Sequence, residues 1–84
     1  MMTTNVKPKF PVGTKLYFRS NKQRKYKIAD HVYYKSIDTW YYWLRGIQKK
    51  SINGVPEWIY INDAKQLTIE SIDNKSKEII IIHE

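Results

Sequence analysis

Asp30 and His31 are adjacent, and a carboxylate beside an imidazole is a pairing that acid–base catalysis often uses. Successive residues of a strand point to opposite faces, so these two side chains cannot easily hydrogen-bond to each other if the segment is extended. No arrangement of a serine or cysteine nucleophile accompanies them, and the chain contains no cysteine. We therefore expect a protein that is not an enzyme.

The two histidines, His31 and His83, are the imidazoles that could ligate a metal, and no pattern of spaced carboxylates accompanies them. The chain has three glycines, Gly13, Gly46 and Gly54, which lie too far apart to form a phosphate-binding loop. The sequence therefore predicts no metal site and no cofactor.

The segment Arg19–Lys27 (RSNKQRKYK) concentrates five cationic side chains around Tyr26. Lysine and arginine neutralise phosphates and a neighbouring tyrosine stacks on bases or sugars, so the segment is typical of a nucleic-acid contact. The alternative is a solvated loop whose charge keeps a tyrosine-rich protein in solution. The predicted binding residues are those of this segment together with a lysine on either side: Lys15, Arg19, Lys22, Arg24, Lys25, Tyr26, Lys27 and Lys35.

Positive charge is unevenly distributed along the chain, whose formal net charge is +7. Residues 7–35 carry nine basic side chains and one acid, a net +8, whereas residues 36–84 carry six basic and seven acidic side chains. One basic face is the footprint expected of a protein that binds a polyanion. DNA or RNA is the leading partner. The alternative is an acidic protein, docked by an interaction module or an inhibitor.

The run Trp40-Tyr41-Tyr42-Trp43 is the densest group of aromatic residues. A small domain needs large side chains to fill its core, and strand alternation places Trp40 and Tyr42 on one face, which we expect to be the core. Tyr41 and Trp43 then lie on the opposite face beside Arg45. These three residues form a second candidate contact surface.

The elements that position these residues are short strands in the first half of the chain. Residues 1–9 are polar and are expected to form a flexible leader. A first strand is predicted over Lys15–Arg19. The basic stretch Ser20–Lys27 is interpreted as a charged loop leading into a strand over Lys27–Lys35, although a helix running as far as Val32 is the competing interpretation.

The second half contains the strongest strand, Thr39–Gln48, in which Gly46 indicates a bulge or a sharp bend. Asn53-Gly54 is a hairpin turn signal that joins this strand to the next one. The remaining elements are a strand over Glu57–Ile61, one helical turn over Asn62–Gln66, a strand beginning at Leu67, and a last strand over Glu78–Ile82 that is expected to pair with Leu67–Ile72.

Four consecutive isoleucines, Ile79–Ile82, require burial on both sides or a partner at an exposed edge. Pairing within the chain is the first interpretation, and a homodimer formed through this strand is the alternative.

Size and composition describe one small domain, residues 10–84, in an 84-residue chain. The absence of cysteine and of any signal-like or membrane-spanning apolar stretch favours a cytoplasmic protein with no membrane partner. Frequent Lys, Ile, Asn and Tyr residues are typical of an AT-rich coding sequence, as in some bacteria and their phages.

Several features together resemble SH3-like small barrels over about residues 10–70. They are Val12-Gly13-Thr14 opening a first strand, an aromatic middle strand, Trp58-Ile59-Tyr60, and Leu67-Thr68-Ile69 after a short helical turn. The resemblance implies a mostly β, small antiparallel barrel of five to six strands with one short helical turn. It implies no particular function. The second glycine-rich turn expected in the translation and transcription branch of these barrels is missing here.

Overall fold

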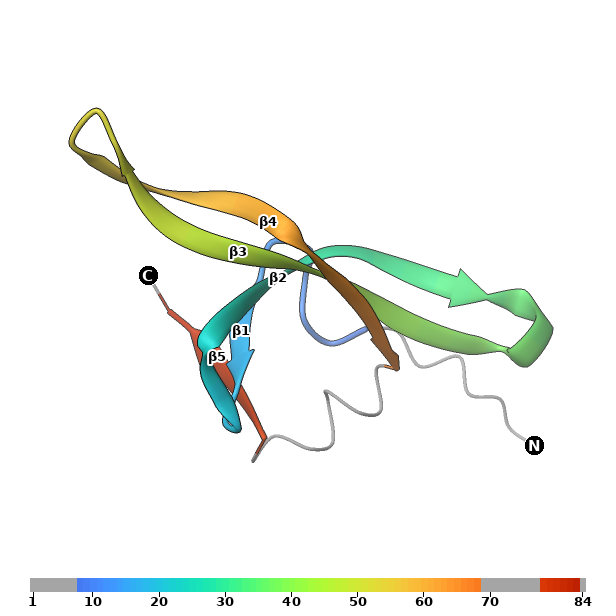
Figure 1. The fold of residues 1–84 in the computed structure, drawn as a ribbon. Coiled ribbons are helices and arrows are strands. Elements are labelled where there is room, and N and C mark those ends of the chain that lie inside the picture. Colours follow the sequence, from blue (N-terminus) through green and yellow to red (C-terminus); the bar gives the residue numbers. More distant parts are fainter. Residues whose placement is uncertain (1–7, 69–77, 84) are drawn as a thin grey trace.

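The computed structural model describes residues 8–68 and 78–83, and it is mostly β, as the sequence predicts. These described residues form five antiparallel strands: β1 (Lys15–Phe18), β2 (Asn21–Tyr34), β3 (Thr39–Ile52), β4 (Val55–Thr68) and β5 (Ile79–Ile82) (Figure 1). They form one sheet in the order β4-β3-β2-β1-β5, and this sheet is not closed. A single 3-10 turn, η1 (Lys35–Ile37), joins β2 to β3.

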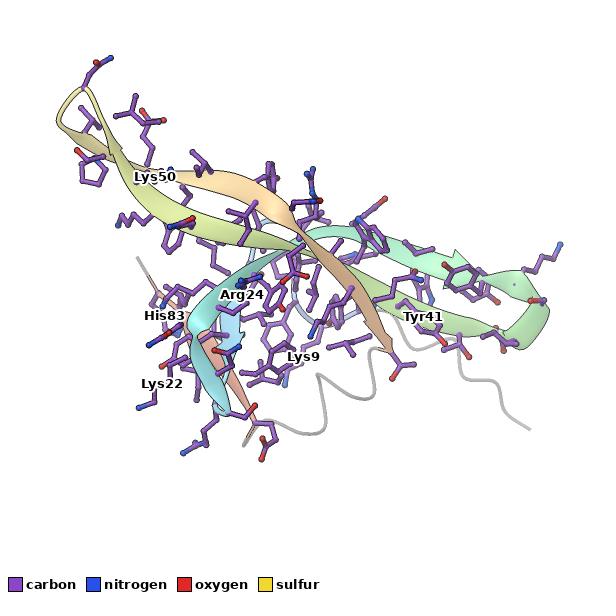
Figure 2. All side chains as sticks on the ribbon, in the orientation of Figure 1. Lys9, Lys22, Arg24, Tyr41, Lys50 and His83 are labelled. Atoms are coloured by element: carbon purple, nitrogen blue, oxygen red, sulfur yellow. The ribbon has the colours of Figure 1, made fainter. Side chains whose placement is uncertain are left out.

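Two long hairpin arms extend from the centre of the sheet in opposite directions (Figure 1). The β2–β3 arm ends at η1, and the β3–β4 arm ends at Asn53-Gly54. Both turn residues have positive φ, 53° and 82°, the left-handed backbone that a two-residue hairpin turn requires. The predicted hairpin is therefore confirmed. Lys50 lies on the β3–β4 arm and Tyr41 on the β2–β3 arm (Figure 2).

The basic stretch is a strand, so both the predicted loop over Ser20–Lys27 and the competing helix are wrong. The chain turns at Arg19-Ser20, and β2 runs without a break from Asn21. Alternation explains the difference, because Tyr26 and Ile28 are buried in the core while Lys27 between them faces the other side. Burial of two large side chains decides the local structure, and the lysines are compatible with it.

The predicted helical turn over Asn62–Gln66 is also wrong, because β4 continues through it as a strand. The extra residues are accommodated in an irregularity opposite Gly46. The pair Arg45–Ala64 is followed by the pair Ile47–Tyr60, so β4 places three residues opposite one glycine. The predicted bulge at Gly46 is confirmed. A Cβ there would lie 2.9 Å from Ile61 Cγ1, which explains why a glycine occupies this position.

The core lies on one face of the sheet and is built from buried side chains of four strands: Leu16, Tyr26, Ile28, Tyr42, Leu44 and Ile79. Tyr42 is fully buried and Trp40 packs against the cluster, as alternation predicts. The Tyr42 hydroxyl accepts hydrogen bonds from the backbone N–H groups of Lys9 and Phe10, at 2.9 and 3.0 Å. These bonds hold the segment before β1, at Lys9 and Phe10, against the core.

The last strand pairs with β1, in the register Leu16–Ile81, and among the described residues it does not pair with Leu67 or Thr68, the start of its predicted partner. Ile79 is buried in the core, which explains the partner, because β1 also contributes Leu16 to that cluster. Residues 69–72 lie outside the described residues, as do the first seven residues of the predicted leader. Within the described sheet β5 is an edge strand, and dimerisation through it remains a prediction. No helix among residues 8–68 and 78–83 is long and apolar enough to cross a membrane.

Candidate polyanion-binding face

The strand register aligns three cations in one row on the face opposite the core. Lys15 of β1 pairs with Lys27 of β2, and Lys27 pairs with Arg45 of β3. Their sequence neighbours Leu16, Ile28 and Leu44 are fully buried, so the three charged side chains point away from the core. Neighbouring strands lie about 4.8 Å apart, so the backbones that carry these three cations span about 10 Å across the sheet.

A second row follows directly and carries aromatic and apolar side chains. Tyr17 pairs with Lys25, Lys25 with Ile47, and Ile47 with Tyr60. Two residues further along the arm, and so on the same face, Lys49 lies opposite Trp58. We call this surface the basic face, and its members are Lys15, Tyr17, Lys25, Lys27, Arg45, Lys49, Trp58 and Tyr60.

Cations and rings on the basic face contact one another. The Arg45 guanidinium carbon lies 4.0 Å from the centre of the Tyr60 ring, and Lys27 Nζ lies 5.5 Å from the same ring. Lys25 Nζ lies 5.5 Å from the Tyr17 ring. Such exposed cation–π contacts contribute about 0.5–1 kcal/mol each. They hold long side chains extended over the sheet, which lowers the entropy that a ligand contact would cost.

Trp58 shows that the sheet curls over this face. Its ring lies 5.3 Å from Lys49 Nζ on the neighbouring strand and 5.9 Å from Lys15 Nζ on β1. Two strands, β3 and β2, separate β4 from β1 in the sheet. A flat sheet would hold these side chains too far apart, because three strand spacings amount to about 14 Å.

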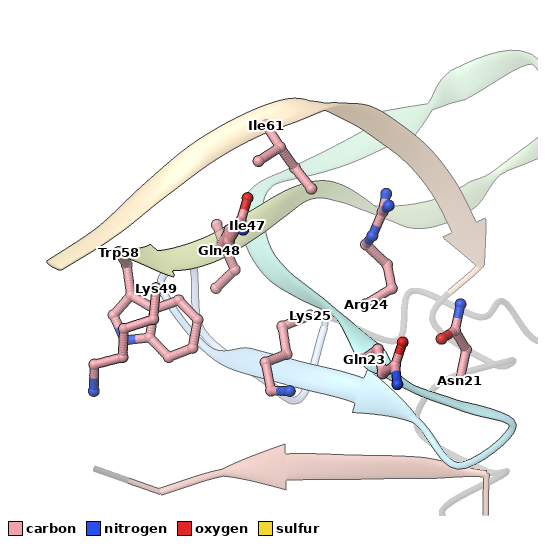
Figure 3. Close-up of a pocket in the computed structure, with 9 residues that line it drawn as sticks. All are labelled: Asn21, Gln23, Arg24, Lys25, Ile47, Gln48, Lys49, Trp58 and Ile61. Atoms are coloured by element: carbon pink, nitrogen blue, oxygen red, sulfur yellow. The ribbon is translucent and has the colours of Figure 1, made fainter. Parts of the chain in front are cut away.

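A cleft of about 580 Å³ opens where β2 and β3 separate. Their pairing begins at Lys25–Ile47, so the earlier residues of β2 and the later residues of β3 diverge. Figure 3 shows side chains from β2, β3 and β4 around this opening. Its lining residues are Asn21, Gln23, Arg24, Lys25, Ile47, Gln48, Lys49, Trp58 and Ile61.

Three of the predicted binding residues, Lys15, Lys25 and Lys27, lie together on the basic face. Arg24 is on the opposite side of β2, where it forms an ion pair with Asp63. The Tyr26 hydroxyl donates to the same carboxylate at 3.2 Å, and its ring, only 5% exposed, packs in the core.

The other predicted cations are dispersed. Arg19 lies at the β1–β2 turn, where its backbone N–H donates to the Glu78 carbonyl. Lys22 is exposed near the start of β2, and Lys35 begins η1 at the end of the β2–β3 arm (Figure 2 labels Lys22). The structure therefore does not place these three beside the row of Lys15, Lys27 and Arg45.

The second candidate surface continues the same face toward η1. Trp43 is 36% exposed, and Tyr41 is half-buried with the Tyr34 ring edge-on to it at 5.1 Å. Arg45 points to Tyr60, so it belongs to the basic face. Asp30 lies opposite Trp43 and places a negative charge beside the row of cations.

Sequence reasoning missed Lys49, Trp58 and Tyr60. A two-residue Asn53-Gly54 turn fixes the hairpin register, and that register places Lys49 opposite Trp58. Alternation along β4 then adds Tyr60 to the same face. The turn signal could therefore have identified these three residues.

The side chains of Asp30 and His31 lie on opposite faces of the sheet. The His31 ring lies on the core side, where Nε2 donates to the Phe10 carbonyl at 2.8 Å and the ring packs edge-on against Tyr42. The Asp30 carboxylate accepts the His31 backbone N–H. Across residues 8–68 and 78–83, no three His, Asp or Glu side chains gather in a way that could hold a metal ion.

Comparison of the chain with protein-family models, curated proteins and solved structures finds no match.

Proposed function

We propose that this protein binds nucleic acid through the basic face. The observation that supports it best is the direct alignment of Lys15, Lys27 and Arg45. Like charges directly opposite one another on a sheet are destabilising, so this arrangement works against the stability of the fold. A polyanion bound along the row would convert that repulsion into attraction, and rings beside the row would supply stacking surfaces.

The number of cations on this face sets the expected salt dependence. In the part of the chain that the structure describes, Arg24 is ion-paired, whereas Lys15, Lys25, Lys27 and Arg45 contact only rings or backbone. With Lys49 they make five cations. Each phosphate contact contributes about 0.7 (single strands) or 0.9 (duplex) to the fall of log K with log salt. Five contacts predict slopes of about −3.5 and −4.5.

Fluorescence anisotropy with labelled single-stranded and duplex oligonucleotides, measured over a salt series, tests the proposal. We expect binding at low salt and slopes near these values. A flat salt dependence, or no binding to DNA or RNA at low salt, would contradict it.

An acidic partner protein is the competing function for the same face. Retention of a partner by the immobilised protein in lysate, with and without nuclease, separates the two. A partner lost after nuclease treatment supports nucleic acid, and an acidic protein retained after it supports the alternative.

An SH3-like fold and a cytoplasmic setting belong to the same proposal. The first is supported by a meander of four strands whose fifth strand returns to pair with the first, an order compatible with a small barrel. The second is supported by the cysteine-free composition.

A further inference from the structure

The cleft between β2 and β3 has the composition of a site for a flat, polar-edged ring. Its apolar surface comes from Ile47, which is 3% exposed, and from Ile61 and the Trp58 ring. Three carboxamides, from Asn21, Gln23 and Gln48, also line it. Nucleobases present this combination, because each has a π-face for stacking and an edge of donors and acceptors that carboxamides match.

Charge at the cleft favours a base that is attached to a phosphate backbone. Lys25 and Lys49 line the cleft, and the centre of the Trp58 ring lies 5.3 Å from the Lys49 ammonium group and 5.9 Å from that of Lys15. A base stacked on Trp58 would therefore have two cations near its flanking phosphates. Lys15 also begins the row that leads to Lys27 and Arg45, so the backbone has a continuous path from the cleft onto the basic face.

Only an unpaired, unstacked base can enter such a recess. In a duplex the faces of the bases are covered by their neighbours, and exposing one costs a few kcal/mol. Single strands avoid this cost. We infer that the cleft holds one base of a single-stranded nucleic acid, stacked on Trp58 and contacted at its edge by the carboxamides. This inference rests on the proposed function and specifies which form of nucleic acid is preferred.

The test compares an aromatic ring in the cleft with one that lies outside every candidate surface. Trp58→Leu removes the stacking ring from the cleft, and Tyr33→Leu removes an exposed ring that neither lines the cleft nor belongs to the basic face. Affinities are measured by anisotropy for a labelled single-stranded oligothymidylate and for a duplex of equal length. We expect Trp58→Leu to weaken single-strand binding roughly 5- to 150-fold, the range for loss of one stacked base, and to affect duplex binding much less. Tyr33→Leu should leave both affinities within about twofold of wild type.

Trp58→Phe provides the control for folding, because it retains a stacking ring. It should recover most of the single-strand affinity, and circular dichroism should show the same β signal for all variants. The inference is overturned if Trp58→Leu binds single strands as wild type does, or if Trp58→Leu and Tyr33→Leu lose affinity equally. In either case the wild-type salt slope still reports separately on the proposed function. If wild type binds neither single strands nor duplex at low salt, both proposals fail.

Discussion

Gly46→Ala is the substitution whose cost can best be worked out from the structure. The new Cβ would lie 2.9 Å from Ile61 Cγ1 and 3.0 Å from Asp63 Cβ. Neither atom is the free end of a flexible side chain, so the backbone of β4 must move. Overpacking of this kind costs about 1–3 kcal/mol. The φ of Gly46 is not positive, so alanine can adopt this backbone conformation. Alanine also lowers the conformational entropy of the unfolded chain, which stabilises the variant by about 0.4–1 kcal/mol. We expect a net loss of about 1.3 kcal/mol, the difference between the middles of the two ranges.

Urea unfolding followed by tryptophan fluorescence measures this loss as a lower midpoint with an unchanged m value. The double variant Gly46→Ala/Ile61→Ala identifies the cause, because Ile61→Ala removes the contacts at 2.9 and 3.1 Å. Gly46→Ala should cost at least about 0.5 kcal/mol less in that background. Wild-type stability in the single variant, or the same cost in both backgrounds, would refute the packing argument.

Two further predictions concern tyrosine hydroxyls. Tyr42→Phe removes the acceptor of two backbone N–H groups, at Lys9 and Phe10, and should cost about 1–3 kcal/mol in the same unfolding assay; a variant as stable as wild type would contradict it. A hydrogen bond to Asp38, with desolvation and the carboxylate charge, raises the pKa of Tyr33 above its ordinary value of 10.0. Because the pKa of Tyr33 is higher in the folded state than in the unfolded state, the protonated hydroxyl stabilises the fold. This contribution is present below pH 10 and is lost as pH rises through the folded-state pKa. Asp38→Asn should lower the Tyr33 pKa in a spectroscopic titration, and an unchanged pKa would disprove the contact.

Local signals in the sequence predict much of the fold. The Asn53-Gly54 turn, the bulge at Gly46 and the burial of Tyr42 each depend on the chemistry of a few adjacent residues, and each is confirmed. The strand β2 is different, because the charged residues near its start make the alternation of Tyr26 and Ile28 hard to recognise.

Pairing between distant strands could not be predicted in the same way. The partner of Ile79–Ile82 depends on which strand shares its core cluster, which no local pattern specifies. The row of cations depends on register across three strands. Irregularities at Tyr17/Phe18 and Ile28/Asp30 set that register, and a slip of one residue would turn Lys27 to the other face. The sequence therefore predicted the charge but not its arrangement.

The most direct measurement of the central claim compares two triple variants that remove the same charge. One removes the row (Lys15→Gln, Lys27→Gln, Arg45→Gln), and the other removes three cations elsewhere (Lys22→Gln, Lys35→Gln, Lys50→Gln). If the row contacts phosphates, the slope of log K against log salt should become less negative by about 2 to 3 in the first variant. In the second variant the slope should change far less. Equal slopes for the two variants would show that net charge, and not the aligned row, attracts the polyanion.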